Sequence, residues 1–197
     1  MQSTINQLAV CEDPKPIRNI QKKIVVLGEG GVGKTTLLHR TVSNIFVDST
    51  KMTIGSDFFM KKIEKKDEKN INHINLLLWD FAGQERFRFI LKDYVRGAEG
   101  VVLCFDLVRL PTLKRLYDWI DILKEGGAWG NEKVKFFLVG TKEDLVSNNS
   151  IAISKEDIDQ CKNDFKIDFF IKTSSLNNNG VEELFNHLAS SMVDREK

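Results

Sequence analysis

The sequence lacks long apolar runs, an excess of charge and a regular pattern of cysteines, and each absence argues against a class of protein. No stretch approaches the roughly 20 apolar residues that a membrane-spanning helix needs, and the N-terminus has no signal-peptide apolar segment. The net charge is +1, from 29 basic and 28 acidic residues, which gives no reason to expect nucleic-acid binding through bulk charge. Cys11, Cys104 and Cys161 have unrelated spacings, which indicates neither a disulfide framework nor a metal site.

The ends of the chain also lack the signals for lipid attachment. Residue 2 is Gln2 rather than the glycine that myristoylation needs, and residues 194–197 contain no cysteine for prenylation. We therefore expect an intracellular, cytoplasmic monomer without a membrane anchor of its own, which would reach a membrane only through a partner. With 197 residues, 42% of them hydrophobic and 29% charged, the chain suits one globular domain with a sizeable core.

Apolar runs alternate with segments of helical periodicity along most of the chain. Strands are predicted over 22–27, 56–64, 71–79, 100–107, 134–140 and 168–173, and helices over 36–44, 111–125, 154–164 and 181–192, with an uneven helix ending near residue 96. The charged turn 65–70 makes the second and third strands an antiparallel hairpin. We expect a three-layer α/β domain with a six-stranded, mostly parallel sheet, one antiparallel edge strand and about five helices. Residues 1–20 are predicted to be a flexible extension, 21–193 the domain and 194–197 a short C-terminal end.

A glycine-rich segment lies between the first predicted strand and the first predicted helix. Residues Gly28–Thr35 read Gly-Glu-Gly-Gly-Val-Gly-Lys-Thr, and in this strand–loop–helix context the pattern G-x-x-x-x-G-K-[ST] predicts a loop that binds nucleoside triphosphates. The glycines let backbone N–H groups point at a phosphate, and the helix N-terminus adds unpaired donors. Lys34 would neutralise the β- and γ-phosphates, and the Thr35 hydroxyl would bind Mg²⁺. The alternative is a turn with no ligand, which four glycines and Lys-Thr in frame argue against.

A second motif follows the third predicted strand. Residues 80–84 read Asp-Phe-Ala-Gly-Gln. Asp80 can bind Mg²⁺ directly or through water, a backbone N–H at Gly83 can reach the γ-phosphate, and the Gln84 amide can orient an attacking water. A lone aspartate at the end of a strand would carry little information, but beside a phosphate-binding loop this motif predicts hydrolysis of the triphosphate.

Two further segments follow the last two predicted strands. Thr141-Lys142-Glu143-Asp144 places a carboxylate where Asp144 could accept the N1–H and exocyclic amine of guanine, a donor pair that adenine lacks. The stem of Lys142 can lie over the base. Thr173-Ser174-Ser175 could offer backbone donors to the base oxygen. Each segment alone is a weak signal, and its place after a strand is what favours guanine.

These motifs, in this order and spacing, resemble the Ras superfamily of small GTPases, closest to its Ras, Rab and Rho branches, over residues 21–193. The resemblance implies a P-loop G domain that binds GTP or GDP with Mg²⁺ and slowly hydrolyses GTP. It implies catalytic roles for Gln84, Lys34 and Gly30, and Mg²⁺ ligands at Thr35, Thr53 and Asp80. The implied nucleotide contacts are Gly28, Glu29, Gly30, Gly31, Val32, Gly33, Lys34, Thr35, Thr36, Phe46, Thr53, Gly83, Thr141, Lys142, Asp144, Ser174, Ser175 and Leu176.

The same resemblance implies a molecular switch. Thr53 and Gly83 would hold two loops against the γ-phosphate of GTP and release them after hydrolysis. The expected partners are an exchange factor, a GTPase-activating protein and effectors, with no nucleic acid. Phe58, Trp79 and Tyr94 fall where Rab-type proteins display an aromatic trio to effectors, although packing within the hairpin and core explains these residues equally well.

The sequence departs from the family pattern at several positions. Thr141 stands where asparagine is usual, Ser175 replaces the usual alanine, Thr50 replaces a frequent tyrosine, and the C-terminal cysteine is absent. The sequence shows no long helical insertion that could supply an arginine in cis. Two alternatives are a GTP-bound scaffold that rarely cycles, against which Gln84 and Gly30 argue, and a P-loop ATPase or kinase, against which Asp144 argues.

Overall fold

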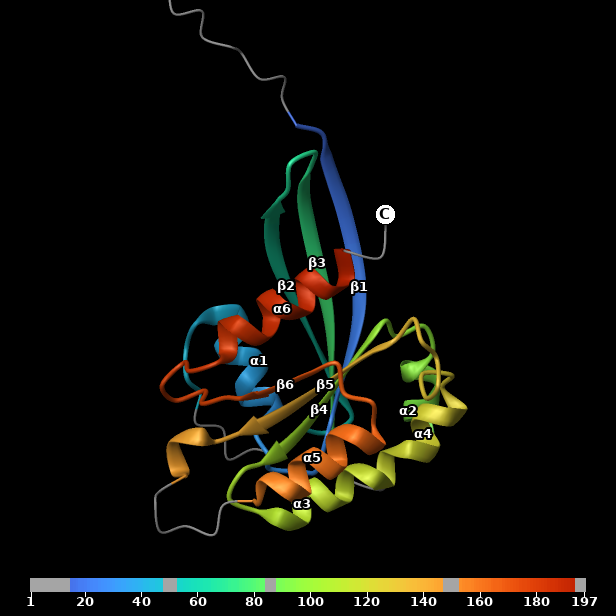
Figure 1. Ribbon diagram of the computed structural model, residues 1–197, viewed down its shortest axis with the longest axis vertical. Helices are drawn as coiled ribbons and strands as arrows, with labels where there is room; N and C mark the ends of the chain where they lie inside the picture. Colours follow the sequence, from blue (N-terminus) through green and yellow to red (C-terminus); the bar gives the residue numbers. More distant parts are fainter. Residues whose placement is uncertain (1–14, 48–52, 84–87, 147–152, 194–197) are drawn as a thin grey trace, which may run out of the picture.

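The computed structural model describes residues 15–47, 53–83, 88–146 and 153–193, and Figure 1 shows one sheet between two layers of helices. The strands are β1 Ile17–Leu27, β2 Ser56–Lys66, β3 Ile71–Phe81, β4 Gly100–Asp106, β5 Lys135–Thr141 and β6 Phe169–Lys172. Their order across the sheet is β2-β3-β1-β4-β5-β6, and each pairing is parallel except β2 with β3. The predicted six-stranded, mostly parallel sheet with one antiparallel edge strand is confirmed.

Helices connect most of the successive parallel strands. They are α1 Lys34–Ser43, α2 Arg88–Val95, α3 Leu110–Lys114, η2 Arg115–Trp119, α4 Ile120–Glu125, η3 Glu143–Leu145, α5 Lys155–Asp164 and α6 Val181–Val193. Because α3, η2 and α4 follow one another without a break, the described chain has five helical regions, which agrees with the predicted number. It also has the short 3₁₀ turn η3. None of the helices in the described part of the chain has the length and apolar content that crossing a membrane would require.

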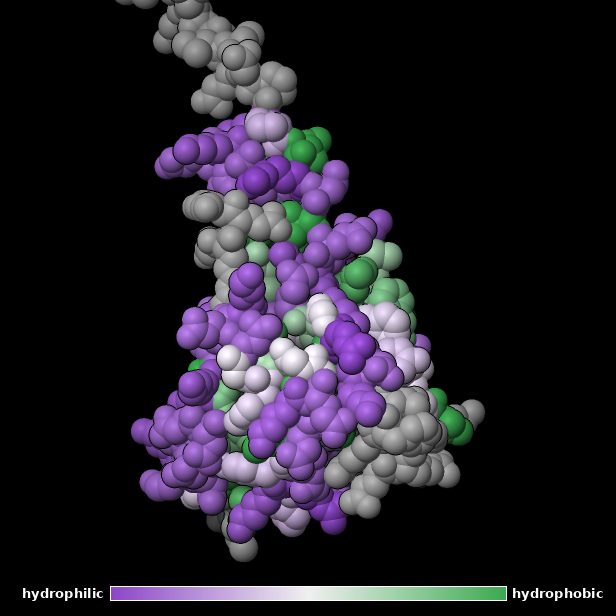
Figure 2. Space-filling model, turned by 90° about the vertical axis from the view of Figure 1, so that its right-hand side faces the viewer, coloured by the Kyte–Doolittle hydropathy of each residue, from purple (hydrophilic) through white to green (hydrophobic). Residues whose placement is uncertain are grey.

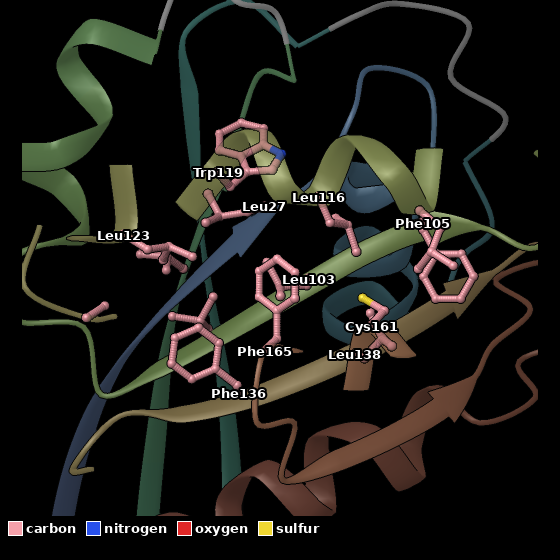
Figure 3. Close-up of a cluster of buried hydrophobic side chains, with 14 of the residues drawn as sticks. Leu27, Leu103, Phe105, Leu116, Trp119, Leu123, Phe136, Leu138, Cys161 and Phe165 are labelled. Atoms are coloured by element: carbon pink, nitrogen blue, oxygen red, sulfur yellow. The ribbon is translucent and has the colours of Figure 1, made fainter. Parts of the chain in front are cut away.

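A hydrophobic core lies on each face of the sheet. One is built from the helices α2 to α5 and the facing residues of β1, β4 and β5, and Figure 3 shows Trp119, Leu116 and Phe165 packed there over the strands. The other buries the apolar faces of α1 and α6 against β1, β3 and β4. These two cores explain why the strands β4 and β5 are apolar except at their ends: both of their faces are covered.

Two helix boundaries follow from local chemistry. The Ser154 side chain accepts a hydrogen bond of 3.0 Å from the backbone N–H of Asp157 and so caps α5, as the sequence predicts. The predicted helix 111–125 has a 3₁₀ segment in its middle, so the pattern locates its ends but not this change of winding. At its C-terminal end Gly126 packs against Val95 of α2, where a Cβ would collide.

The first strand begins earlier than predicted. β1 starts at Ile17, inside the range 1–20 assigned to a flexible extension, and Ile17 pairs with Ile71 at the start of β3. Figure 1 shows β1, β2 and β3 projecting beyond the other strands, and Figure 2 shows a largely hydrophilic surface at that end. Asp67 closes the hairpin turn by accepting 2.7 Å hydrogen bonds from the backbone N–H groups of Lys69 and Asn70. Residues 1–14 lie outside the described ranges.

Candidate nucleotide-binding site

The segment Gly28–Thr35, the phosphate loop, connects β1 to α1 at the edge of the sheet where the parallel strands end. Gly33 occupies the N-cap of α1 with φ 101°, a left-handed conformation that favours glycine. The Lys34 side chain folds back over the loop, and its Nζ donates to the carbonyl oxygens of Gly28 (2.9 Å) and Glu29 (3.0 Å). Burial lowers the pKa of Lys34, while the charge of Asp80 raises it. The loop therefore encloses one ammonium group that is only 6% exposed.

Two glycines make this part of the fold possible. A Cβ on Gly28 would overlap the carbonyl oxygen of Cys104 in the neighbouring strand β4. A Cβ on Gly83 would overlap the backbone of Gly28, Glu29 and Gly30. The segment after β3 therefore lies directly on the phosphate loop, so residues 80–83 and the phosphate loop meet.

Three oxygen-bearing side chains meet beside Lys34. The hydroxyl of Thr35 donates to Asp80 Oδ2 at 2.5 Å, and the Thr53 hydroxyl lies 2.8 Å from that of Thr35. Since the single proton of Thr35 goes to Asp80, Thr53 is the donor in the second bond. Residues 53, 35 and 80 come from three separate segments, and the fold brings them together.

Asp80 carries the clearest indication of a cation-binding site. Its side chain is fully buried, and its Oδ1 has no hydrogen-bond partner within the described residues. Burial raises the pKa of Asp80, and the attraction of Lys34 does not offset this. Carboxylate and hydroxyl oxygens are the ligands that Mg²⁺ prefers. The residues present therefore fit a magnesium ion.

The segment after β5 is tied to the phosphate loop. Thr141 Oγ1 lies 2.5 Å from the carbonyl oxygen of Val32 and 2.8 Å from that of Phe105, so its one proton serves these two acceptors in turn. Lys142 Nζ donates to the carbonyl oxygen of Gly31 at 2.9 Å and pairs with Asp106 at 2.7 Å. Threonine at position 141 therefore connects the two loops through its hydroxyl.

The segment after β6 contacts the side chain of Asp144, the residue predicted to bind the guanine base. Ser174 is fully buried, and its hydroxyl donates to Asp144 Oδ1 at 2.5 Å. The backbone N–H of Glu143 donates to the carbonyl oxygen of Thr173 at 3.0 Å. This leaves Asp144 Oδ2 for a ligand. Ser175 is partly buried beside it, and Leu176 is 50% exposed.

Two other predicted residues, Thr36 and Phe46, lie less centrally. Thr36 lies in the first turn of α1 and is partly buried. Phe46, 37% exposed, follows α1, and among the described residues no hydrogen bond or ring contact joins it to the loops after β5 and β6. Gln84, the predicted catalytic glutamine, lies outside the described residues.

Two arginines beside the phosphate loop were missed by sequence reasoning. Glu29 Oε1 accepts a 2.8 Å hydrogen bond from Arg115 in η2, and its Oε2 lies 3.5 Å from Arg109. The Glu29 side chain is 20% exposed, whereas the two arginines are about half exposed. The only local signal would have been basic residues after β4, and nothing in their spacing indicates an acceptor 86 residues away.

The predicted aromatic trio is contiguous. The rings of Phe58 and Trp79 have centroids 5.2 Å apart, and those of Trp79 and Tyr94 are 5.4 Å apart. Phe58 is 46% exposed, whereas the other two are partly buried against the core. The trio therefore packs together and also presents a surface.

Comparisons with known proteins agree with this geometry. Residues 23–194 match the model of the Ras family. The chain is 36% identical to Ras-related protein RABD2b of Arabidopsis thaliana over 88% of its length and 81% of the relative's. It is 35% identical to GTP-binding protein YPTM2 of Zea mays (88% and 80%) and 33% identical to Ras-related protein Rab-30 of Homo sapiens (89% and 81%). Together with the phosphate loop and its neighbours, these matches show that the chain belongs to the Ras family of small GTPases, the switch proteins that hydrolyse GTP.

Proposed function

We propose that this GTPase holds Mg²⁺ through Thr35, Thr53 and Asp80 and reads the guanine base through Asp144. The observation that carries the proposal is the meeting of the three oxygen ligands next to Lys34, with one buried Asp80 oxygen unpartnered. A bound Mg²⁺ would supply positive charge against the phosphates. The proposed unit is residues 21–193, which the family match over 23–194 supports.

Hydrolysis in this scheme depends on placing charge and water rather than on covalent chemistry. Lys34 would exchange its two loop carbonyls for phosphate oxygens, and the backbone N–H groups around Gly30 would cradle them. Gln84 would orient the attacking water. We expect a slow intrinsic rate, which a partner that supplies an arginine would raise roughly 10³–10⁵-fold.

The switch would work through Thr53 and Gly83, which contact the phosphate loop from two different segments. Loss of the γ-phosphate would release both segments. The contiguous surface of Phe58, Trp79 and Tyr94 supports effector binding next to them. We further propose regulation by an exchange factor and an activating protein, and action as a monomer inside the cell, where a partner directs it to membranes.

Base specificity has a direct test. Displacement of labelled GDP by unlabelled GDP, ADP and xanthosine diphosphate is measured for the wild type and Asp144→Asn. We expect GDP to compete at least about a hundredfold better than ADP, because Asp144 accepts from two guanine donors. In Asp144→Asn the preference should move towards xanthine, which has an oxygen where guanine has its amine. Equal competition by ADP and GDP in the wild type would contradict the guanine assignment.

Hydrolysis needs a separate test. Single-turnover phosphate release is compared for the wild type and Gln84→Leu, each loaded with GTP. We expect the variant to be roughly tenfold or more slower. If the two rates are the same while GTP remains bound, the glutamine has no role and the alternative of a GTP-bound scaffold that rarely cycles gains support.

A further inference from the structure

A cavity lies at the opposite edge of the sheet from the phosphate loop. It has a volume of about 300 Å³ and is lined by the loop 129–134, the start of β5, the end of α5 and the turn before β6. β5 runs from this cavity to the base-reading segment, so its seven residues separate the two sites by about 20 Å. Figure 1 shows the loop after α4 and the end of α5 on the right-hand side of the molecule, and Figure 2 faces that side.

The floor of the cavity is aromatic. Trp129 stands edge-on to Phe165 (centroids 5.3 Å apart) and to Phe136 (6.2 Å apart), both at 86°. Phe136 and Phe165 are buried and belong to the core cluster in Figure 3, whereas Trp129 is only partly buried. A flat apolar group bound here would therefore contact rings that the core already holds in place. Its binding would cost little side-chain conformational entropy.

The rim of the cavity is charged, with three carboxylates against two ammonium groups: Glu132, Asp164 and Asp168, Lys135 and Lys166. Lys135 pairs with Asp168, which also accepts a 2.9 Å hydrogen bond from the backbone N–H of Phe136. In these contacts one ammonium group and one carboxylate of the rim are paired with each other.

Asp164 is the carboxylate that lacks a cation. It accepts hydrogen bonds from Tyr117 (2.6 Å) and Gln160 (2.8 Å), both neutral donors, and the described part of the chain places no cation in an ion pair with it. These two bonds hold the pKa of Asp164 below its ordinary value, with Tyr117 as the larger cause. Lys166, on the same rim, is exposed on a left-handed turn with φ 50°.

We propose that this cavity is a second binding site, for a small amphipathic amine whose flat apolar group lies on the aromatic floor and whose ammonium group pairs with Asp164. A volume of about 300 Å³ is at the lower end for small-molecule sites and suits a ligand of about a dozen non-hydrogen atoms. A ligand of this size binds with a Kd of about 1 mM. The proposal is independent of the residue roles assigned above to the nucleotide site.

Tryptamine and indole-3-acetate are suitable probes because they share the indole ring and have opposite charges. Each is titrated into the ¹⁵N-labelled, GDP-loaded full chain, and the indole N–H resonances of Trp79, Trp119 and Trp129 are followed after assignment by substitution with phenylalanine. We expect tryptamine to shift Trp129 with a Kd of about 1 mM and indole-3-acetate to bind at least about tenfold more weakly. Equal binding of both probes, or a tryptamine shift at Trp79 without one at Trp129, would overturn the proposal.

Two rim variants form a matched pair. Asp164→Asn removes the negative charge and keeps one acceptor oxygen, which can serve Tyr117 or Gln160 but not both as the two carboxylate oxygens now do. We expect this variant to weaken tryptamine binding about tenfold. Lys166→Gln removes a like charge from the same rim, and tryptamine binding should stay the same or tighten. The opposite ranking would indicate an anion site and overturn the proposal. Should Asp164→Asn fail to fold, the comparison of the two probes on the wild type still decides.

Discussion

Replacing Asp80 by asparagine should stabilise the nucleotide-free protein while weakening its binding of Mg²⁺. The carboxylate is fully buried, one of its oxygens has no partner within the described residues, and the attraction of Lys34 does not offset burial. Asparagine can still accept the hydrogen bond from Thr35 through its oxygen, and it removes the buried charge. We expect a gain in the free energy of unfolding of about 1–2 kcal/mol, which raises the Tm by about 2–8 °C for a chain of this size.

The assay is thermal unfolding, measured in EDTA without nucleotide and then with saturating Mg²⁺ and GDP. Ligand at a thousand times its Kd adds about 4 kcal/mol to the wild type, whereas Asp80→Asn should gain much less because a metal ligand is lost. The order of the two melting temperatures should therefore reverse between the two conditions. Asp121→Asn, which changes an 87% exposed carboxylate, is the matched control and should leave both temperatures unchanged. A lower Tm for Asp80→Asn in EDTA would refute the reasoning.

Three further predictions concern other parts of the fold. Thr141→Val removes the hydroxyl that links β5 to the phosphate loop, so GDP dissociation followed by fluorescence should quicken by about 2–12-fold, and Thr141→Ser should behave as the wild type. Gly83→Ala puts a Cβ into the phosphate-loop backbone, so single-turnover hydrolysis should fall by about tenfold or more; an unchanged rate would mean that the two segments separate freely. Burial raises the pKa of the Cys104 and Cys161 thiols to about 12, so both should resist alkylation at pH 8 until the protein unfolds. Because unfolded thiols lose their protons near pH 9 while these native thiols keep them, the free energy of unfolding should decline as the pH rises from about 9 towards 12, which titration of denaturant midpoints would show.

Sequence patterns were most informative where local chemistry decides the structure. The phosphate loop needs glycines and Lys-Thr between a strand and a helix. The interiors of β4 and β5 need apolar residues because helices cover both of their faces. Each requirement concerns a few consecutive residues, and the predicted fold is confirmed.

Features that depend on distant partners were harder to predict. Residues Ile17–Gln21 form a strand only because β3 is long enough to pair with them, and their own polar composition suggests a loose segment. The contacts of Glu29 with Arg109 and Arg115 join parts of the chain about 80 residues apart, and no periodicity encodes them. The cavity beside Trp129 likewise arises where two separate stretches of the chain, 129–136 and 164–168, meet.

The contacts of Thr141 and Lys142 with the phosphate loop have a consequence for how a nucleotide is assembled in its site. Both side chains donate to phosphate-loop carbonyl oxygens, Thr141 to Val32 and Lys142 to Gly31. The residues that face the base and those that face the phosphates are therefore linked directly by hydrogen bonds. A fragment that binds at one of these two groups of residues also orders the other group. The second fragment then binds at a smaller cost in conformational entropy. Guanosine and pyrophosphate, added as separate molecules, should therefore bind with positive cooperativity, and each should raise the apparent affinity of the other by the same factor.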